Sequence, residues 1–161
     1  MSPASFTIDG LVVGREETAE GHRDLSVLSS QRGLLRCRLR VSVRKASSSP
    51  DLFSEIEAVL NPLSGNHLFF LGEWRAIRSR PVIGEDYRRL EAAGALARLV
   101  LLNARWLDTF DYISSLMGKA LDAMNQGLPP EAARFKALFL LVKSEGYPVE
   151  ESWLTSWSKA D

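Results

Sequence analysis

The amino-acid sequence predicts an α+β fold, in which a small antiparallel β-barrel over residues 1–80 precedes an α-helical domain over residues 81–161. Three observations lead to this prediction. Short apolar segments separated by turn residues fill the first half of the chain. Apolar residues recur at three- and four-residue steps in the second half, and strands do not alternate with helices. Strands followed by helices are typical of α+β proteins.

The predicted strands are short, and polar turns containing glycine or proline separate them. They cover residues 8–14, 25–28, 35–43 and 54–60, with a last strand or strand pair over 68–71 and 74–77. Residues 15–23, 29–33, 46–51 and 61–66 are the predicted connections. Five or six strands at this spacing indicate a small antiparallel barrel.

The second half predicts three helices. The first covers residues 87–106, with small residues on its packing face. Asp108 can cap a second helix, which stops near Gly127. Pro130 is well placed in the first turn of a third helix, and Gly146 ends it.

Composition excludes several classes of protein. The single cysteine, Cys37, leaves neither an intrachain disulfide nor a multi-cysteine zinc site. The first residues lack the basic and apolar regions of a signal peptide, and the longest apolar runs, such as 99–102, are far too short to cross a bilayer. We therefore expect a cytoplasmic protein with no membrane partner, no metal and no cofactor.

Motifs that would indicate an enzyme are missing, among them a glycine-rich phosphate loop and a nucleophile elbow. His22 and His67 fall in predicted turns, where a solvated histidine is favoured over a ligand or a base. Cys37 lies on the inward face of its strand, so it is interpreted as a small buried hydrophobic residue. The sequence predicts a protein that is not an enzyme.

Basic residues gather on one predicted strand. Residues 35–43 alternate strictly, so that Arg36, Arg38 and Arg40 share one face of a half-buried strand, and Arg44 and Lys45 follow it. The net charge of the whole chain is zero, with 20 basic and 20 acidic residues, so this is a local feature. Arginines two residues apart lie about 6–7 Å from one another, a spacing that suits successive phosphates. We therefore predict that these five residues bind DNA.

Alternatives remain for these features. Glu55 and Glu57 could neutralise the arginines from a neighbouring strand, in which case the row would be structural. Trp153 and Trp157 could seal the core or anchor a partner. The barrel also has four aromatic residues that could stack on bases, although most of them are expected in the core: Phe53, Phe69, Phe70 and Trp74.

Three segments of the chain resemble the bacterial recombination-mediator family RecO. Residues 10–39 are similar to the opening of that family, where an apolar strand leads through a polar hairpin to a basic strand. Residues 71–100 resemble its passage from the last barrel strand into the first helix. Residues 137–153 resemble its helix ending in a Gly-Tyr-x-Pro-like corner.

The resemblance implies an OB-fold barrel followed by a helical domain. It also implies a protein of recombinational repair that binds single- and double-stranded DNA and supports strand annealing or recombinase loading, with RecR and single-stranded-DNA-binding protein as partners. The chain departs from the family after its basic strand, where the usual glycine is absent. It also lacks the family's paired cysteines, so we expect a zinc-free form with a shortened helical domain. The alternative is a protein-interaction module that keeps this architecture without binding DNA.

Overall fold

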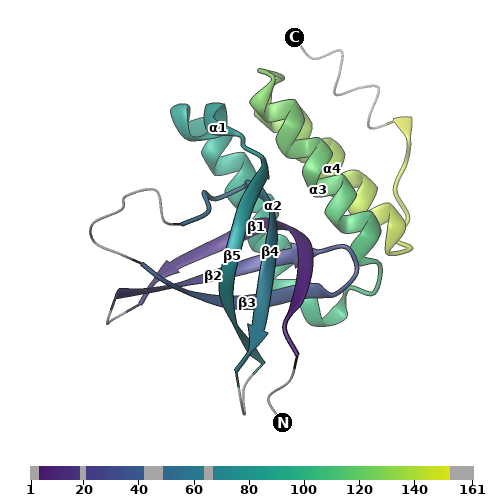
Figure 1. Cartoon of the computed structure of the whole chain (residues 1–161). Coiled ribbons are helices and arrows are strands. Elements are labelled where there is room, and N and C mark those ends of the chain that lie inside the picture. Colours follow the sequence, from purple (N-terminus) through teal and green to yellow (C-terminus); the bar gives the residue numbers. More distant parts are fainter. Residues whose placement is uncertain (1–3, 19–20, 42–48, 64–66, 153–161) are drawn as a thin grey trace. The chain divides into compact units, whose positions relative to one another are not determined.

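A computed structural model describes residues 4–18, 21–41, 49–63 and 67–152 (Figure 1). The strands come first along the chain, and the helices follow. The strands are β1 (Phe6–Glu17), β2 (His22–Ser29), β3 (Gly33–Arg40), β4 (Glu55–Pro62) and β5 (Leu68–Arg78). The helices are α1 (Pro81–Glu85), α2 (Tyr87–Asn103), the 3-10 turn η2 (Ala104–Trp106), α3 (Phe110–Asn125) and α4 (Pro130–Ser144).

The five strands form a closed barrel in the order β1-β2-β3-β5-β4. β1 pairs antiparallel with both β2 and β4, whereas β3 pairs parallel with β5. A five-stranded barrel with this non-sequential order is the arrangement of an OB-fold. The predicted α+β fold, an OB-fold barrel followed by helices, is therefore confirmed.

Inward-facing apolar side chains from all five strands fill the barrel. The buried core consists of Ile8, Val12, Leu25, Val27, Leu35, Cys37, Leu39, Ile56, Ala58, Leu60 and Leu71. Because each of the five described strands is paired on both sides, this sheet has no long open edge along which another chain could pair. The outer face is therefore the part of the sheet that remains for binding.

The first hairpin is longer than the sequence predicted. Residues 15–23 were expected to form a turn, but β1 continues to Glu17 and β2 begins at His22. Polar residues can extend these strands because the end of β1 is exposed, and the Nε atom of Arg23 donates to Glu17 at 2.8 Å across the pair. The last strand is also continuous over residues 68–78 rather than divided in two.

Glycines follow the ends of helices α3 and α4. Gly127 and Gly146 both have positive φ, at 91° and 81°. After α4, the backbone N–H of Tyr147 donates to the Val142 carbonyl at 3.0 Å, a hydrogen bond typical of a glycine-terminated helix. The predicted start of the third helix at Pro130 and its end at Gly146 are confirmed.

The chain divides into two compact units. The first combines residues 1–79 with 100–114, and the second combines 80–99 with 115–161. Residues of the predicted helical segment thus contribute to both units. None of the helices in the described ranges is long and apolar enough to cross a membrane.

A buried arginine anchors the start of α1 within the second unit. The side chain of Arg80 is fully buried, and its Nε atom lies 2.7 Å from the Asp122 carboxylate on α3. Removing one partner of a buried ion pair leaves an uncompensated charge, which costs about 3–5 kcal/mol. This pair therefore holds α1 to α3.

We expect Asp122→Ala to lower the free energy of unfolding by about 3–5 kcal/mol in urea denaturation. The double variant Arg80→Met/Asp122→Leu should recover most of that loss because no charge is then left buried. Glu91→Ala, which removes an exposed carboxylate from α2, is the control and should change stability by less than about 0.5 kcal/mol. A loss below about 1 kcal/mol for Asp122→Ala would contradict this role of the pair.

Candidate nucleic-acid interface

β3 directs its apolar side chains into the barrel and its arginines outward, as the alternation predicted. Arg36 and Arg40 are exposed, and Arg38 is half-buried. The inward residues are at most 9% exposed: Leu35, Cys37 and Leu39. The arginine row is therefore on the outer surface of the barrel, and the backbone at Arg36 and Arg38 is paired with strands on both sides.

The strand pairing determines which side chains flank the arginines. On one side β2 runs antiparallel to β3 and places Asp24 opposite Arg38. On the other side β5 runs parallel to β3, with Leu68 opposite Arg36 and Phe70 opposite Arg38. The row therefore lies between a strand that carries a carboxylate and a strand that carries apolar side chains.

Glu55 and Glu57, the carboxylates that the alternative interpretation set against the row, lie on β4, which is not next to β3. Glu57 instead accepts two hydrogen bonds from Arg75 on β5, and Glu55 lies 4.0 Å from Arg78. The proposed compensation by these two residues is therefore wrong. The error arose from strand order, because β5 separates β4 from β3 in the barrel.

Asp24 compensates the row instead. Its carboxylate accepts hydrogen bonds from Nε and Nη2 of Arg38 at 2.8 and 3.0 Å, and from Nη2 of Arg36 at 3.5 Å. Only 4% of Asp24 is exposed, so water competes little for these bonds. The hydrogen bonds from Arg38 hold the pKa of Asp24 below its ordinary value, although burial opposes this shift.

Asp24 contacts two of the three guanidinium groups, those of Arg36 and Arg38, and this leaves positive charge on the face. Arg38 is held in a two-point contact, which fixes the orientation of its guanidinium group. The long contact of Arg36 is weak, and 64% of its side chain is exposed. Arg40 forms no ion pair with any residue in the described ranges. Arg36 and Arg40 therefore remain able to bind an external anion.

A surface hollow of about 410 Å³ adjoins the row. It is lined by Asp24, Arg36, Arg38, His67 and Leu68. His67 is exposed here, next to the start of β5, whereas His22 lies at the start of β2. The hollow combines two guanidinium groups with one apolar side chain, a chemistry that suits a phosphate attached to an organic group.

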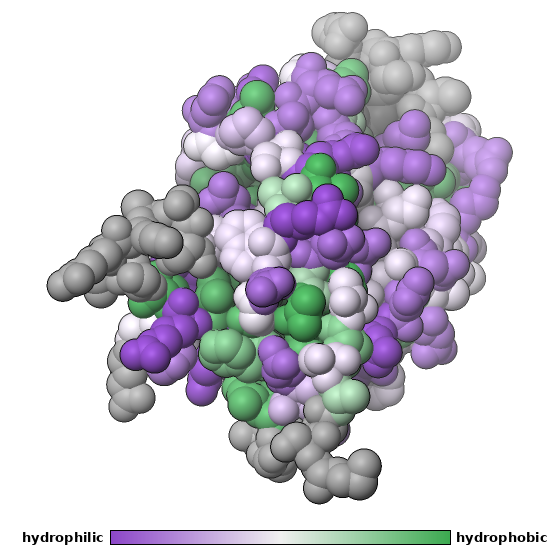
Figure 2. All heavy atoms as spheres, in the orientation of Figure 1, coloured by the Kyte–Doolittle hydropathy of each residue, from purple (hydrophilic) through white to green (hydrophobic). Residues whose placement is uncertain are grey.

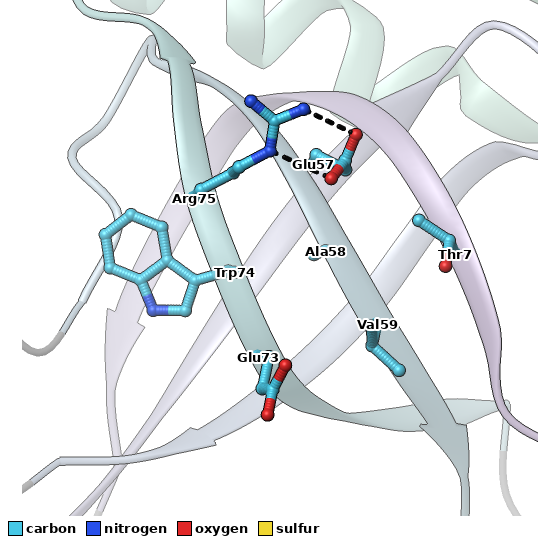
Figure 3. A pocket seen from close by; sticks show the side chains of 7 residues that line it. All are labelled: Thr7, Glu57, Ala58, Val59, Glu73, Trp74 and Arg75. Atoms are coloured by element: carbon cyan, nitrogen blue, oxygen red, sulfur yellow. Dashed lines mark hydrogen bonds and ion pairs between the residues drawn. The ribbon is translucent and has the colours of Figure 1, made fainter.

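A second hollow, of about 290 Å³, lies over β1, β4 and β5 and is less suited to an anion (Figure 3). The arginine in its lining, Arg75, points toward Glu57 and donates to both of its oxygens at 2.9 Å. Glu73 adds a second carboxylate at the same site. Because acidic groups outnumber basic groups in this hollow, we place the candidate site on β3.

The aromatic residues of the barrel differ in exposure. Phe53 is 2% exposed, and Phe69 and Trp74 pack against the core. Phe69, Phe70 and Trp74 are all partly exposed, and Trp74 also lines the hollow of about 290 Å³. The surface in Figure 2 shows hydrophobic side chains among charged ones over β4 and β5. Phe70 alternates with the inward Phe69 and Leu71, so strand alternation places this candidate on the outer face.

Several residues singled out in the sequence lie outside the described ranges. Arg44 and Lys45, which follow β3, are two of them, and Trp153 and Trp157 are the others. Their proposed roles stay predictions. Within the described ranges, no group of three or more histidine, cysteine or acidic side chains is arranged to hold a metal ion.

Comparison with known proteins does not assign the chain, since no family model and no curated protein matches its sequence.

Asp24 should contribute stability that depends on pH. Because its pKa is lowered in the folded protein, this contribution is complete above the unfolded value of about 3.9 and is lost as the pH falls through the folded value. We expect Asp24→Asn to reduce the free energy of unfolding at pH 7 by about 1.5–3 kcal/mol. The difference in free energy of unfolding between the parent protein and Asp24→Asn should shrink below about pH 4. Urea denaturation at about pH 7 and at about pH 3 measures this change.

Glu73→Gln serves as the control for Asp24→Asn, because this carboxylate is exposed on β5. Its stability should follow that of the parent protein at both pH values. A constant difference between parent and Asp24→Asn from pH 7 to pH 3 would contradict a stabilising role of the ionised carboxylate.

Cys37 should be inert in the folded protein. The thiol is fully buried, and burial raises its pKa to about 12, so almost no nucleophilic thiolate exists at neutral pH. We expect less than one-tenth labelling by iodoacetamide at pH 8 under native conditions and complete labelling in denaturant, both measured by mass spectrometry. Rapid native labelling would show that the barrel opens around β3.

Proposed function

We propose that this chain is a RecO-like DNA-binding protein of recombinational repair, which binds DNA through the outer face of its barrel and catalyses no reaction. The observation that carries the proposal is the outward row of Arg36, Arg38 and Arg40, which Asp24 neutralises in part. The row lies on the β2–β3 face, which OB-folds use to bind oligonucleotides.

Physical chemistry supports a phosphate ligand for this face. Alternate residues of a strand lie about 6–7 Å apart, and guanidinium groups can each contact two phosphate oxygens. The backbone of β3 is hydrogen-bonded to both neighbouring strands, so little further ordering is required on binding. Because the chain has no net charge, binding should depend on this face and not on the general surface.

The resemblance to the RecO family extends the proposal to annealing or recombinase loading in the cytoplasm, with RecR and single-stranded-DNA-binding protein as partners. The family uses its OB-fold barrel and helical domain for these tasks without turnover chemistry. An OB-fold barrel followed by helices is the architecture that this proposal requires.

A second candidate function is protein binding, which is favoured by a hollow of about 160 Å³ between α3 and α4. The side chains that line it are alanines and leucines, together with two lysines that favour an acidic partner. It consists of Leu116, Lys119, Ala120, Ala123, Ala133, Lys136, Ala137 and Leu140. Binding of a protein partner that tolerates salt, without measurable DNA affinity, would favour this function over the first.

The test of DNA binding is a titration of a fluorescent single-stranded oligonucleotide at two salt concentrations. The affinity of the parent protein should fall steeply with salt, because arginine–phosphate contacts release counterions. Arg36→Glu/Arg40→Glu should bind at least about tenfold more weakly. The slope of the logarithm of its binding constant against the logarithm of the salt concentration should be less steep by about 0.7 for each phosphate that the variant no longer neutralises. Arg38 is kept in this variant because its bonds to Asp24 are part of the barrel surface.

Arg98→Glu/Arg134→Glu is the matched control, since it changes the net charge equally but on helices α2 and α4. It should bind DNA within about twofold of the parent protein if binding is local to the β3 face. Equal weakening by both variants would contradict a local site. Unchanged binding by Arg36→Glu/Arg40→Glu would contradict the proposed face.

A further inference from the structure

The outer face of the barrel has a definite order of side chains around Arg38. Four consecutive strand pairings align Glu16 with Asp24, Asp24 with Arg38, Arg38 with Phe70, and Phe70 with Asn61. Across the barrel surface, the side chains in line with Arg38 are therefore acidic on β1 and β2, basic on β3, aromatic on β5 and polar on β4. A bound anion is repelled from the β1–β2 side, so this order directs it toward β3 and β5.

Phe70 points outward because its two neighbours on β5 point inward. Leu71 is 1% exposed, and Phe69 packs against the barrel core. The ring of Phe69 is already in edge-to-face contact with Phe6, with ring centroids 5.5 Å apart. Phe70 is partly exposed between Arg38 and the exposed Asn61, where a phenyl ring contributes little to the core.

Leu68 continues the apolar row along β5. It is the next outward residue before Phe70, pairs with Arg36, and lines the 410 Å³ hollow. The outer face thus carries a cationic row on β3 and an apolar row on β5. Neighbouring strands lie about 4.8 Å apart, so one nucleotide can reach both rows, its phosphate on the first and its base on the second.

We propose that this face binds an unpaired DNA strand, with one base stacked on Phe70 and the adjacent phosphates on the arginine row. The proposal rests on the proposed function and adds the form of DNA that the site selects. The bases of a duplex are stacked on one another and are not free to cover a side chain, whereas those of a single strand are free. Aromatic stacking tolerates every base, so the preference should be for single strands and not for a sequence.

The test separates the base from the phosphate. A labelled oligothymidylate and an abasic oligomer of the same length carry the same phosphates, but only the first can stack. The parent protein should bind oligothymidylate about tenfold more tightly, which corresponds to about 1.4 kcal/mol for one stacked base. Phe70→Leu removes the ring but keeps an apolar side chain, so it should lose this preference and bind the abasic oligomer like the parent protein.

Two variants control for other effects of the substitution. Tyr87→Leu removes an exposed aromatic ring from α2 and should keep the tenfold preference. Phe70→Trp offers a larger stacking surface, so it should bind oligothymidylate more tightly and the abasic oligomer as before. This second variant keeps the test decisive if Phe70→Leu does not fold, which a thermal melt followed by circular dichroism would reveal.

The outcomes distinguish the two proposals. If the parent protein binds neither oligomer, the proposed DNA-binding function is wrong. If it binds both oligomers equally, DNA binding stands and stacking on Phe70 is overturned. Stacking on Phe70 is also overturned if Phe70→Leu keeps the preference, or if Phe70→Trp changes neither affinity.

Discussion

Three residue pairs between β3 and β5 close the barrel, and the candidate site is a consequence of this closure. The pair Cys37–Phe69 turns inward and joins the core, so its neighbours Arg36–Leu68 and Arg38–Phe70 must turn outward. Side chains alternate along both strands, and the same hydrogen bonds that complete the barrel therefore set a cationic row beside an apolar one. The register between β3 and β5 therefore sets the core and the outer face together.

Asp24 shows how the barrel accommodates a row of like charges. Its carboxylate holds Arg38 by two hydrogen bonds and contacts Arg36 weakly, so the repulsion between guanidinium groups is reduced without being abolished. Full neutralisation would stabilise the surface but would leave no attraction for phosphate. Contact of Asp24 with two of the three arginines favours both a stable strand and a local positive face.

Much of the fold could be predicted, because its signals are local. The alternation over residues 35–43 predicted both faces of β3, and Gly146 predicted the end of α4. Asp24 was missed as the partner of Arg38 although a signal existed. The hairpin pairs Ser29 with Gly33, whose φ is 75°, and this short turn sets the register that places Asp24 opposite Arg38. The register that follows from this turn identifies Asp24 as the residue opposite Arg38.

The sequence alone determined which residues of β3 face the core, because side-chain direction follows from the pleat of a single strand. Only the tertiary structure decided which strands flank β3, since strand order depends on distant segments that close the barrel around a shared core. Glu55 and Glu57 were for this reason assigned to the wrong neighbour. Phe70, one of four candidate aromatic residues, proved to be the outward one through its pairing with Arg38 and Asn61.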